Sequence, residues 1–112
     1  MAALFDRVVG APLNHFYSGA GLFILGYFKP AAAELEESVR LLGSQGDDSL
    51  AHYYLGLAYR ESGKREESLK ALETFAARSG LDPHDLRVET AKKISAALKR
   101  KNQGNFLSDA AQ

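Results

Sequence analysis

The sequence predicts an all-α domain in which antiparallel helical hairpins stack on one another. Two observations support this fold class. The residues that begin at His15 recur 37 positions later from His52, and a repeat of this period is typical of stacked helical hairpins. The apolar residues also recur every three or four positions, as they do on one face of a helix. No segment alternates apolar and polar residues as a half-buried strand would.

The first hairpin is expected to follow a short apolar lead segment, residues 1–11. Pro12 suits the first turn of a helix, and this helix should continue to Leu25 and stop at Gly26. Glycine favours a helix stop because it accepts the left-handed backbone conformation. The partner helix is expected from Pro30 to Leu42, with Leu35 on its apolar face.

The second hairpin follows a loop of glycine, serine and aspartate that begins at Gly43. Asp48 or Ser49 can cap the next helix, which should reach Ser62 before Gly63 stops it. Its partner is expected over 64–79 and should stop at Gly80.

A fifth helix is expected after Asp82 and Pro83, as its cap and its first helical residue. It should end near Lys101 and cover the last apolar face of the stack. The predicted organisation is a lead segment at 1–11, a helical domain at 12–101 and a flexible tail at 102–112. Within the domain, repeat 1 covers about 12–47, repeat 2 about 48–81 and the capping helix about 83–101.

The repeated residues have packing roles in this scheme. Gly19 and Gly56 fall in the middle of helices, where glycine costs about 1 kcal/mol relative to alanine. Their recurrence predicts that a partner helix approaches closely. Ala31 and Ser68 are the small residues expected at that crossing, and the leucines four positions later should fill the contact.

The second unit resembles a tetratricopeptide repeat. The family pattern combines a large residue, a Leu-Gly pair, a tyrosine, a glycine and a small residue, and it is matched by His52, Leu55, Gly56, Tyr59, Gly63, Ser68 and Leu72. The first unit departs from it, with Ser18 in place of the leucine and Leu22 in place of the tyrosine. The resemblance implies a short right-handed solenoid of about five helices, which binds a peptide or protein segment in its concave groove.

In this family the first helix of each unit lines the groove. The groove would then be aromatic and apolar at one end and basic at the other. It would suit a peptide with an apolar anchor and acidic residues. The expected partner-binding residues are Phe16, Phe23, Tyr53, Leu57, Arg60, Lys92 and Lys99.

An alternative interpretation is a structural module that self-associates, as a homodimer or a larger oligomer. The first helix is very apolar, and an exposed apolar face seldom stays uncovered on a monomer. Leu4 and Phe5 of the lead segment could cover Phe16, Phe23 and Ile24, or a second copy of the chain could do so.

No residue constellation in the sequence indicates an enzyme, and the composition does not favour a nucleic-acid-binding protein. The formal net charge is zero, whereas a nucleic-acid-binding domain is expected to carry a basic excess. The chain has no cysteine, which fits a cytoplasmic protein, and its most apolar run is too short to span a membrane. We expect no catalytic residues, cofactor or metal, and we interpret His15 and His52 as bulky core residues.

Overall fold

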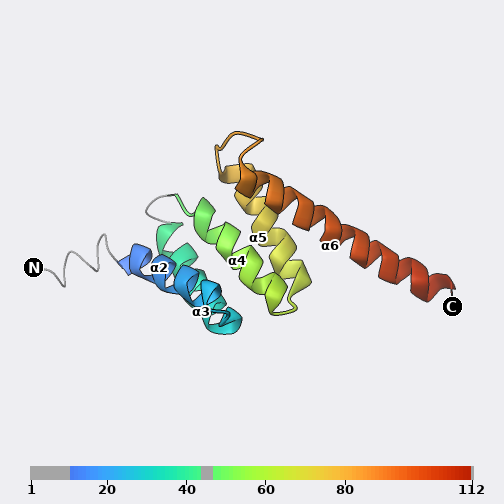
Figure 1. The fold of residues 1–112 in the computed structure, drawn as a ribbon, viewed down its shortest axis with the longest axis horizontal. Helices are drawn as coiled ribbons and strands as arrows, with labels where there is room; N and C mark the ends of the chain where they lie inside the picture. The colour runs from blue at the N-terminus through green and yellow to red at the C-terminus, as the bar shows by residue number, and fades with distance from the viewer. Residues whose placement is uncertain (1–10, 44–46, 112) are drawn as a thin grey trace, which may run out of the picture.

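A computed structural model describes the backbone of residues 11–43 and 47–111, and the side chains of residues 13–43 and 47–101. The described residues form helices and connecting turns, with no strand among them. The prediction of an all-α protein is therefore confirmed at the level of fold class. The helices shown in Figure 1 are α2 (Ala11–Ile24), α3 (Phe28–Leu42), α4 (Ser49–Glu61), α5 (Arg65–Arg78) and α6 (Leu86–Ala111).

Tight turns fold the first four of these helices into two antiparallel hairpins. The backbone of Gly26 has a φ of 89° between α2 and α3, and that of Gly63 has a φ of 83° between α4 and α5. These values lie in the left-handed region that glycine adopts at little cost. The two hairpins lie side by side through α3 and α4, and α6 packs on α5 (Figure 1).

Both mid-helix glycines mark a close crossing of the two helices of a hairpin, as the sequence predicted. A Cβ atom added to Gly19 would lie 2.5 Å from Cγ of Leu35, and one added to Gly56 would lie 2.6 Å from Cγ of Leu72. Both leucines are fully buried. Ser68 is also buried at the second crossing, and its hydroxyl donates a hydrogen bond to the Gly56 carbonyl oxygen at 2.7 Å. The same packing is thus built twice.

The core consists of two apolar clusters, one between α3 and α4 and one among α4, α5 and α6. The first is centred on Leu35 and Leu55, and the second on Leu72 and Phe75. Tyr54 of α4 packs against both clusters. It therefore links the two clusters, and the first cluster itself joins the two hairpins.

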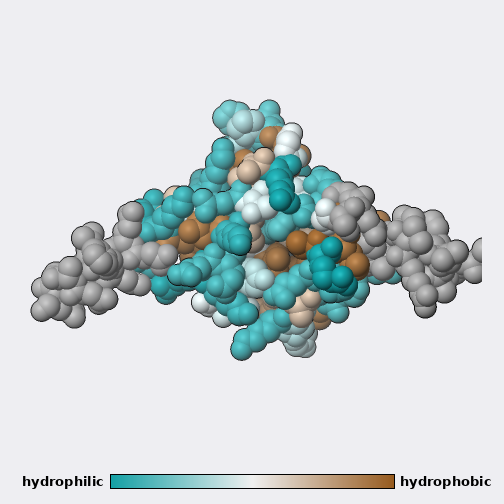
Figure 2. Space-filling view, turned by 180° about the vertical axis from the view of Figure 1, so that it is seen from behind, coloured by the Kyte–Doolittle hydropathy of each residue, from teal (hydrophilic) through white to brown (hydrophobic). Residues whose placement is uncertain are grey.

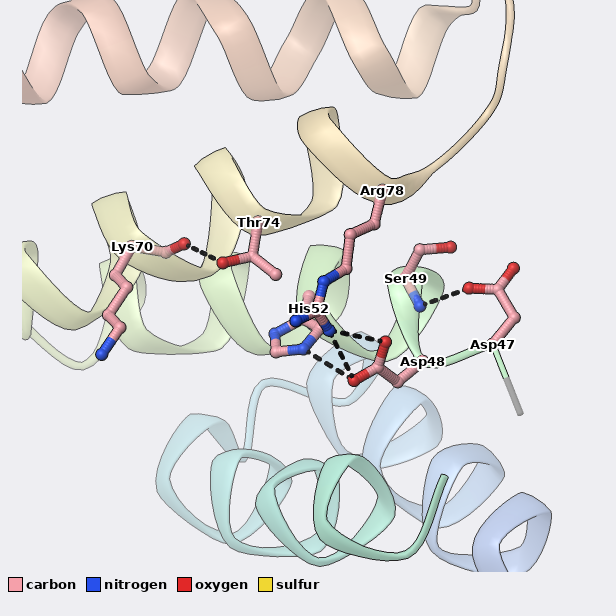
Figure 3. Close-up of polar contacts among 7 residues, drawn as sticks. All are labelled: Asp47, Asp48, Ser49, His52, Lys70, Thr74 and Arg78. Atoms are coloured by element: carbon pink, nitrogen blue, oxygen red, sulfur yellow. Dashed lines mark hydrogen bonds and ion pairs between the residues drawn. The ribbon is translucent and has the colours of Figure 1, made fainter. Parts of the chain in front are cut away.

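Polar side chains add contacts between neighbouring elements. Asp48, which is buried, lies 3.0 Å from Nε2 of His52 and 3.3 Å from Nη1 of Arg78, so it ties the start of α4 to the end of α5 (Figure 3). Tyr59 of α4 donates a hydrogen bond to Glu36 of α3 at 2.8 Å. These contacts link elements that the apolar clusters already hold together.

The two repeated histidines make polar contacts, which the sequence interpretation of bulky core residues did not include. Nδ1 of His15 lies 2.6 Å from Oε2 of Glu34 on α3. The His15 side chain is 36% exposed and that of His52 is 15% exposed. The interpretation as a core residue therefore fits His52 better than His15. Each imidazole ring also contacts a carboxylate.

The predicted start of the last helix is wrong. Asp82 and Pro83 belong to a turn, in which Asp82 accepts a hydrogen bond from the His84 amide at 2.8 Å. Helix α6 begins at Leu86, because Asp85 accepts a hydrogen bond from the Arg87 amide at 2.9 Å and so acts as the cap. Its carboxyl group also pairs with the Arg87 guanidinium, which lowers its pKa.

The other helix boundaries fall close to their expected positions. Helix α3 begins at Phe28, two residues before Pro30, and a proline in the first turn loses no helical hydrogen bond. Ahead of α4, Asp47 accepts the hydrogen bond from the Ser49 amide, whereas neither Asp48 nor Ser49 caps the helix with its own side chain. Helix α6 continues to Ala111, through the region expected as a flexible tail. The expected lead segment, apart from Ala11, lies outside the described residues.

Candidate functional site

The two predicted aromatic anchors of α2 lie in a cluster that joins α2 to α4. The ring of Phe16 lies 5.8 Å from that of Tyr54, and the ring of Phe23 lies 6.3 Å from it. Phe23 also packs against Phe28 at 5.6 Å. Both anchors are half-buried, so they contribute to the core and offer part of their surface. Leu4 and Phe5, which were considered as their cover, lie outside the described residues.

Tyr53 and Leu57 of α4 face inwards, towards α5 and α6. The ring of Tyr53 lies 4.9 Å from that of Phe75, and the residue is only 9% exposed. Burial raises the pKa of its hydroxyl. Leu57 packs against the same cluster and is half-buried. Tyr53 is therefore a core residue here and not an open anchor, because α6 covers it through Val88 and Ala91.

Arg60 lies in an open pocket between the α4–α5 turn and α6. The pocket has a volume of about 620 Å³. We call it the basic pocket, because its wall holds four cationic side chains and one carboxylate. Its lining residues are Arg60, Glu61, Gly63, Arg65, Lys93, Ile94, Ala97, Leu98 and Lys101.

Among the described residues, none of the four cations of the basic pocket makes an ion pair. Arg60, Lys93 and Lys101 are exposed, and Arg65 is half-buried. Cations held close together without carboxylate partners create a positive potential, which attracts anionic groups. Ile94 and Leu98 line the same pocket with apolar side chains, and we call them its apolar floor. The site can therefore accept carboxylates together with apolar side chains.

Lys92 and Lys99 lie on another flank of α6 and not in the basic pocket. They line a separate hollow with Glu73, Ala76 and Ala77 of α5. Nζ of Lys99 lies 3.2 Å from Oε2 of Glu73, so its charge is already paired. The structure thus brings Arg60 together with Lys93 and separates it from the two lysines that the sequence analysis selected.

The sequence contained one signal that could have identified Lys93 and Lys101. Lys93 lies two residues after the core residue Ala91, and Lys101 lies three residues after the core residue Leu98. Lys92 and Lys99 each lie one residue after the same core residues. Each pair lies on one flank of the same apolar stripe. Which flank faces α4 depends on how α6 crosses α5, and this crossing is a property of the folded chain.

The turn of the first hairpin carries a group of exposed apolar side chains. We call Ile24, Leu25 and Tyr27 the apolar turn; they are 77%, 72% and 59% exposed. Figure 2 shows hydrophobic surface in separate patches among hydrophilic surface on this face of the molecule. Such exposed groups often mark interaction surfaces.

In the described part of the chain, no three or more His, Cys, Asp or Glu residues are grouped as metal ligands would be. No described helix is long and apolar enough to cross a bilayer. The sequence matches no protein-family model, no curated protein and no solved structure.

Proposed function

We propose that this protein is an interaction module that binds a peptide or protein segment, with its hairpins arranged as a short tetratricopeptide-like solenoid. In support, both hairpins cross at a glycine and a buried leucine. Helices that are neighbours in the chain also pack on one another, as they do in repeat proteins. The second unit resembles the tetratricopeptide pattern in sequence, and the proposal extends this resemblance to the whole helical domain.

The observation that carries this proposal is the basic pocket. Arg60 and Lys93 present charge from two different helices across an open hollow, and they make no ion pair among the described residues. Guanidinium groups bind carboxylates through paired hydrogen bonds, and lysines add positive charge. The apolar floor can hold a side chain of the same ligand. We therefore propose an acidic segment of another protein as the ligand.

The adjacent residues Lys92 and Lys93 provide a matched test. Both are exposed lysines on α6, but only Lys93 lines the basic pocket. Peptides are selected from a random 12-residue phage library on the purified chain, and their binding to K93E and K92E is measured by fluorescence anisotropy. We expect acidic peptides, at least tenfold weaker binding to K93E and little change with K92E.

Several results would contradict the proposal. They include failure to enrich any peptide, enrichment of peptides without carboxylates, or equal weakening by both substitutions. Circular dichroism of each variant provides the folding control, because both positions are on the surface and neither substitution should change the helix content.

A second candidate function, self-association, is favoured by Tyr17 of α2. Its equivalent in the second repeat, Tyr54, packs against Phe16 and Phe23 of the preceding helix pair. Tyr17 itself is 67% exposed, and Leu13, one turn earlier on the same face, is also exposed. We propose that a second copy can cover this face. Light scattering over a range of concentrations tests the idea, since Y17K should lower the apparent mass of an oligomer and a strict monomer would exclude it.

A further inference from the structure

The apolar turn and the equivalent turn of the second hairpin share a backbone conformation but differ in the polarity of their side chains. In the first turn, the Tyr27 amide donates a hydrogen bond to the Leu22 carbonyl at 2.9 Å, and the Lys64 amide bonds the Tyr59 carbonyl at the same distance in the second. Each turn also has its glycine with a positive φ. The two turns are therefore built in the same way.

The side chains on these two turns are opposite in polarity. Positions 24, 25 and 27 are Ile, Leu and Tyr, and the equivalent positions of the second hairpin are Glu61, Ser62 and Lys64. The hydrophilic set closes the same turn, so the scaffold does not require the apolar set. Exposing three large apolar side chains to water is unfavourable, which points to a contact with another molecule.

The surface beside the two turns holds two cations and one carboxylate. Lys29 and Lys64 flank a hollow of about 360 Å³ between α3 and the end of α4, and Glu36 and Tyr59 lie in the same hollow. Nζ of Lys64 lies 5.7 Å from the centre of the Tyr59 ring. Arg65, close to Lys64 in the chain, then lines the basic pocket. Charge complementarity along this path favours an acidic ligand over a neutral or basic one.

We propose that the apolar turn binds the apolar anchor of an acidic protein segment whose carboxylates enter the basic pocket. This inference rests on the proposed function and adds a second, specificity-determining contact to it. Ile24, Leu25 and Tyr27 contact the anchor in this proposal, and their chain neighbours Phe23 and Phe28 pack together with their ring centres 5.6 Å apart. At protein interfaces a few buried residues, tyrosine often among them, carry most of the binding energy.

The spacing within the partner follows from helix packing. Packed helices lie about 8–10 Å apart, and the two hairpins pack through α3 and α4. We therefore infer a separation of about one or two such distances between the apolar turn and the basic pocket. An extended chain covers about 3.3 Å per residue. The partner should therefore place its carboxylates about three to six residues from its apolar anchor.

The second hairpin supplies the test variant, I24E/L25S/Y27K, in which the apolar turn takes the residues of the equivalent turn. Because the second hairpin folds with these residues, the variant should keep the helix content and melting temperature of the natural chain. Peptides are selected from the random 12-residue phage library on the natural chain, and the enriched peptides are synthesised with a fluorescent label. We expect them to carry a large apolar residue three to six positions from two or more carboxylates.

Binding of these labelled peptides to the triple variant decides the question. We expect it to weaken at least tenfold, and to weaken equally when the apolar residue of the peptide is replaced by serine. The serine peptide should bind the natural chain and the triple variant alike. If the peptides lose affinity for K93E but not for the triple variant, the proposed function stands and the apolar anchor is refuted. If neither variant changes binding, both proposals fail.

Two other occupants of the apolar turn are distinguished by separate measurements. If the natural chain is a dimer in light scattering and the triple variant is a monomer, a second copy occupies the turn and the inference is wrong. If the natural chain co-sediments with phosphatidylserine vesicles and the triple variant does not, the ligand is a lipid surface and the inference is again wrong. The inference is supported if the natural chain is a monomer, does not co-sediment with the vesicles and binds the selected peptides.

Discussion

Replacing Gly56 by alanine should destabilise the protein, although alanine is the better helix former. The added Cβ atom would lie 2.6 Å from Cγ and 2.7 Å from Cδ2 of Leu72, and 3.3 Å from the Leu72 amide nitrogen. Leu72 is fully buried, so it cannot swing into solvent. The two helices must separate, or Leu72 must take a strained rotamer.

The expected magnitude comes from two opposing terms. Overpacking a core typically costs about 1–3 kcal/mol, and replacing glycine by alanine inside a helix contributes about 1 kcal/mol of stability. G56A should therefore lose up to about 2 kcal/mol. Gly21 provides the matched control, because a Cβ atom there meets nothing within 4 Å. G21A should gain up to about 1 kcal/mol from helix propensity.

Urea unfolding followed by circular dichroism measures both changes. The difference between the two alanine variants isolates the clash, and it should be about 1–3 kcal/mol. A double-mutant cycle with L72A adds a direct check, since removing the leucine side chain removes the clash and the two losses should not add. The reasoning is refuted if G56A is as stable as G21A, or if the losses at Gly56 and Leu72 are additive.

Three further predictions concern polar contacts. S68A removes the hydrogen bond to the Gly56 carbonyl and should cost about 1 kcal/mol in urea unfolding; an unchanged midpoint would argue against that bond. Burial and the hydrogen bond to Glu36 raise the pKa of Tyr59 above its ordinary value of 10.0, so the folded protein keeps this proton at a pH where the unfolded chain loses it. Stability should therefore fall as the pH rises above about 10, and Y59F should make the fall shallower in alkaline unfolding curves; parallel curves would contradict this. D85A should lower the melting temperature more than D82A, because Asp85 caps α6; the opposite order would restore the sequence-based helix start.

The hairpin interiors could be predicted from the sequence because local rules determine them. The recurrence of Gly19 and Leu35 as Gly56 and Leu72 predicted a close crossing in both units. The structure has it, since a Cβ atom added to either glycine would lie only 2.5 or 2.6 Å from the leucine Cγ. The helix ends could also be predicted. Gly26 and the later stop glycines have positive φ values, which few other residues adopt.

The candidate site could be predicted only in part. An apolar and a basic contribution to the surface were expected, and Arg60 does line a basic pocket. Lys92 and Lys99 were expected in one groove with Arg60, but Lys93 and Lys101 line the pocket of Arg60 instead. The sequence does not specify how α6 crosses α5, and this crossing decides which lysines face α4. Tyr53 was predicted as an open anchor, but Val88 of α6 packs in the same buried cluster. This contact joins residues far apart in the chain, so local sequence patterns did not indicate it.

The order in which the helices pack has a consequence for how the chain folds. Apart from the contact between α2 and α4, the main packing joins helices that follow one another in sequence. Short loops are closed at a small entropic cost, and proteins dominated by local contacts fold within microseconds to milliseconds. Each hairpin can thus form around its own glycine–leucine crossing while the rest of the chain is still unfolded. Folding can start in either hairpin and spread to its neighbour through Tyr54, whose ring contacts both clusters.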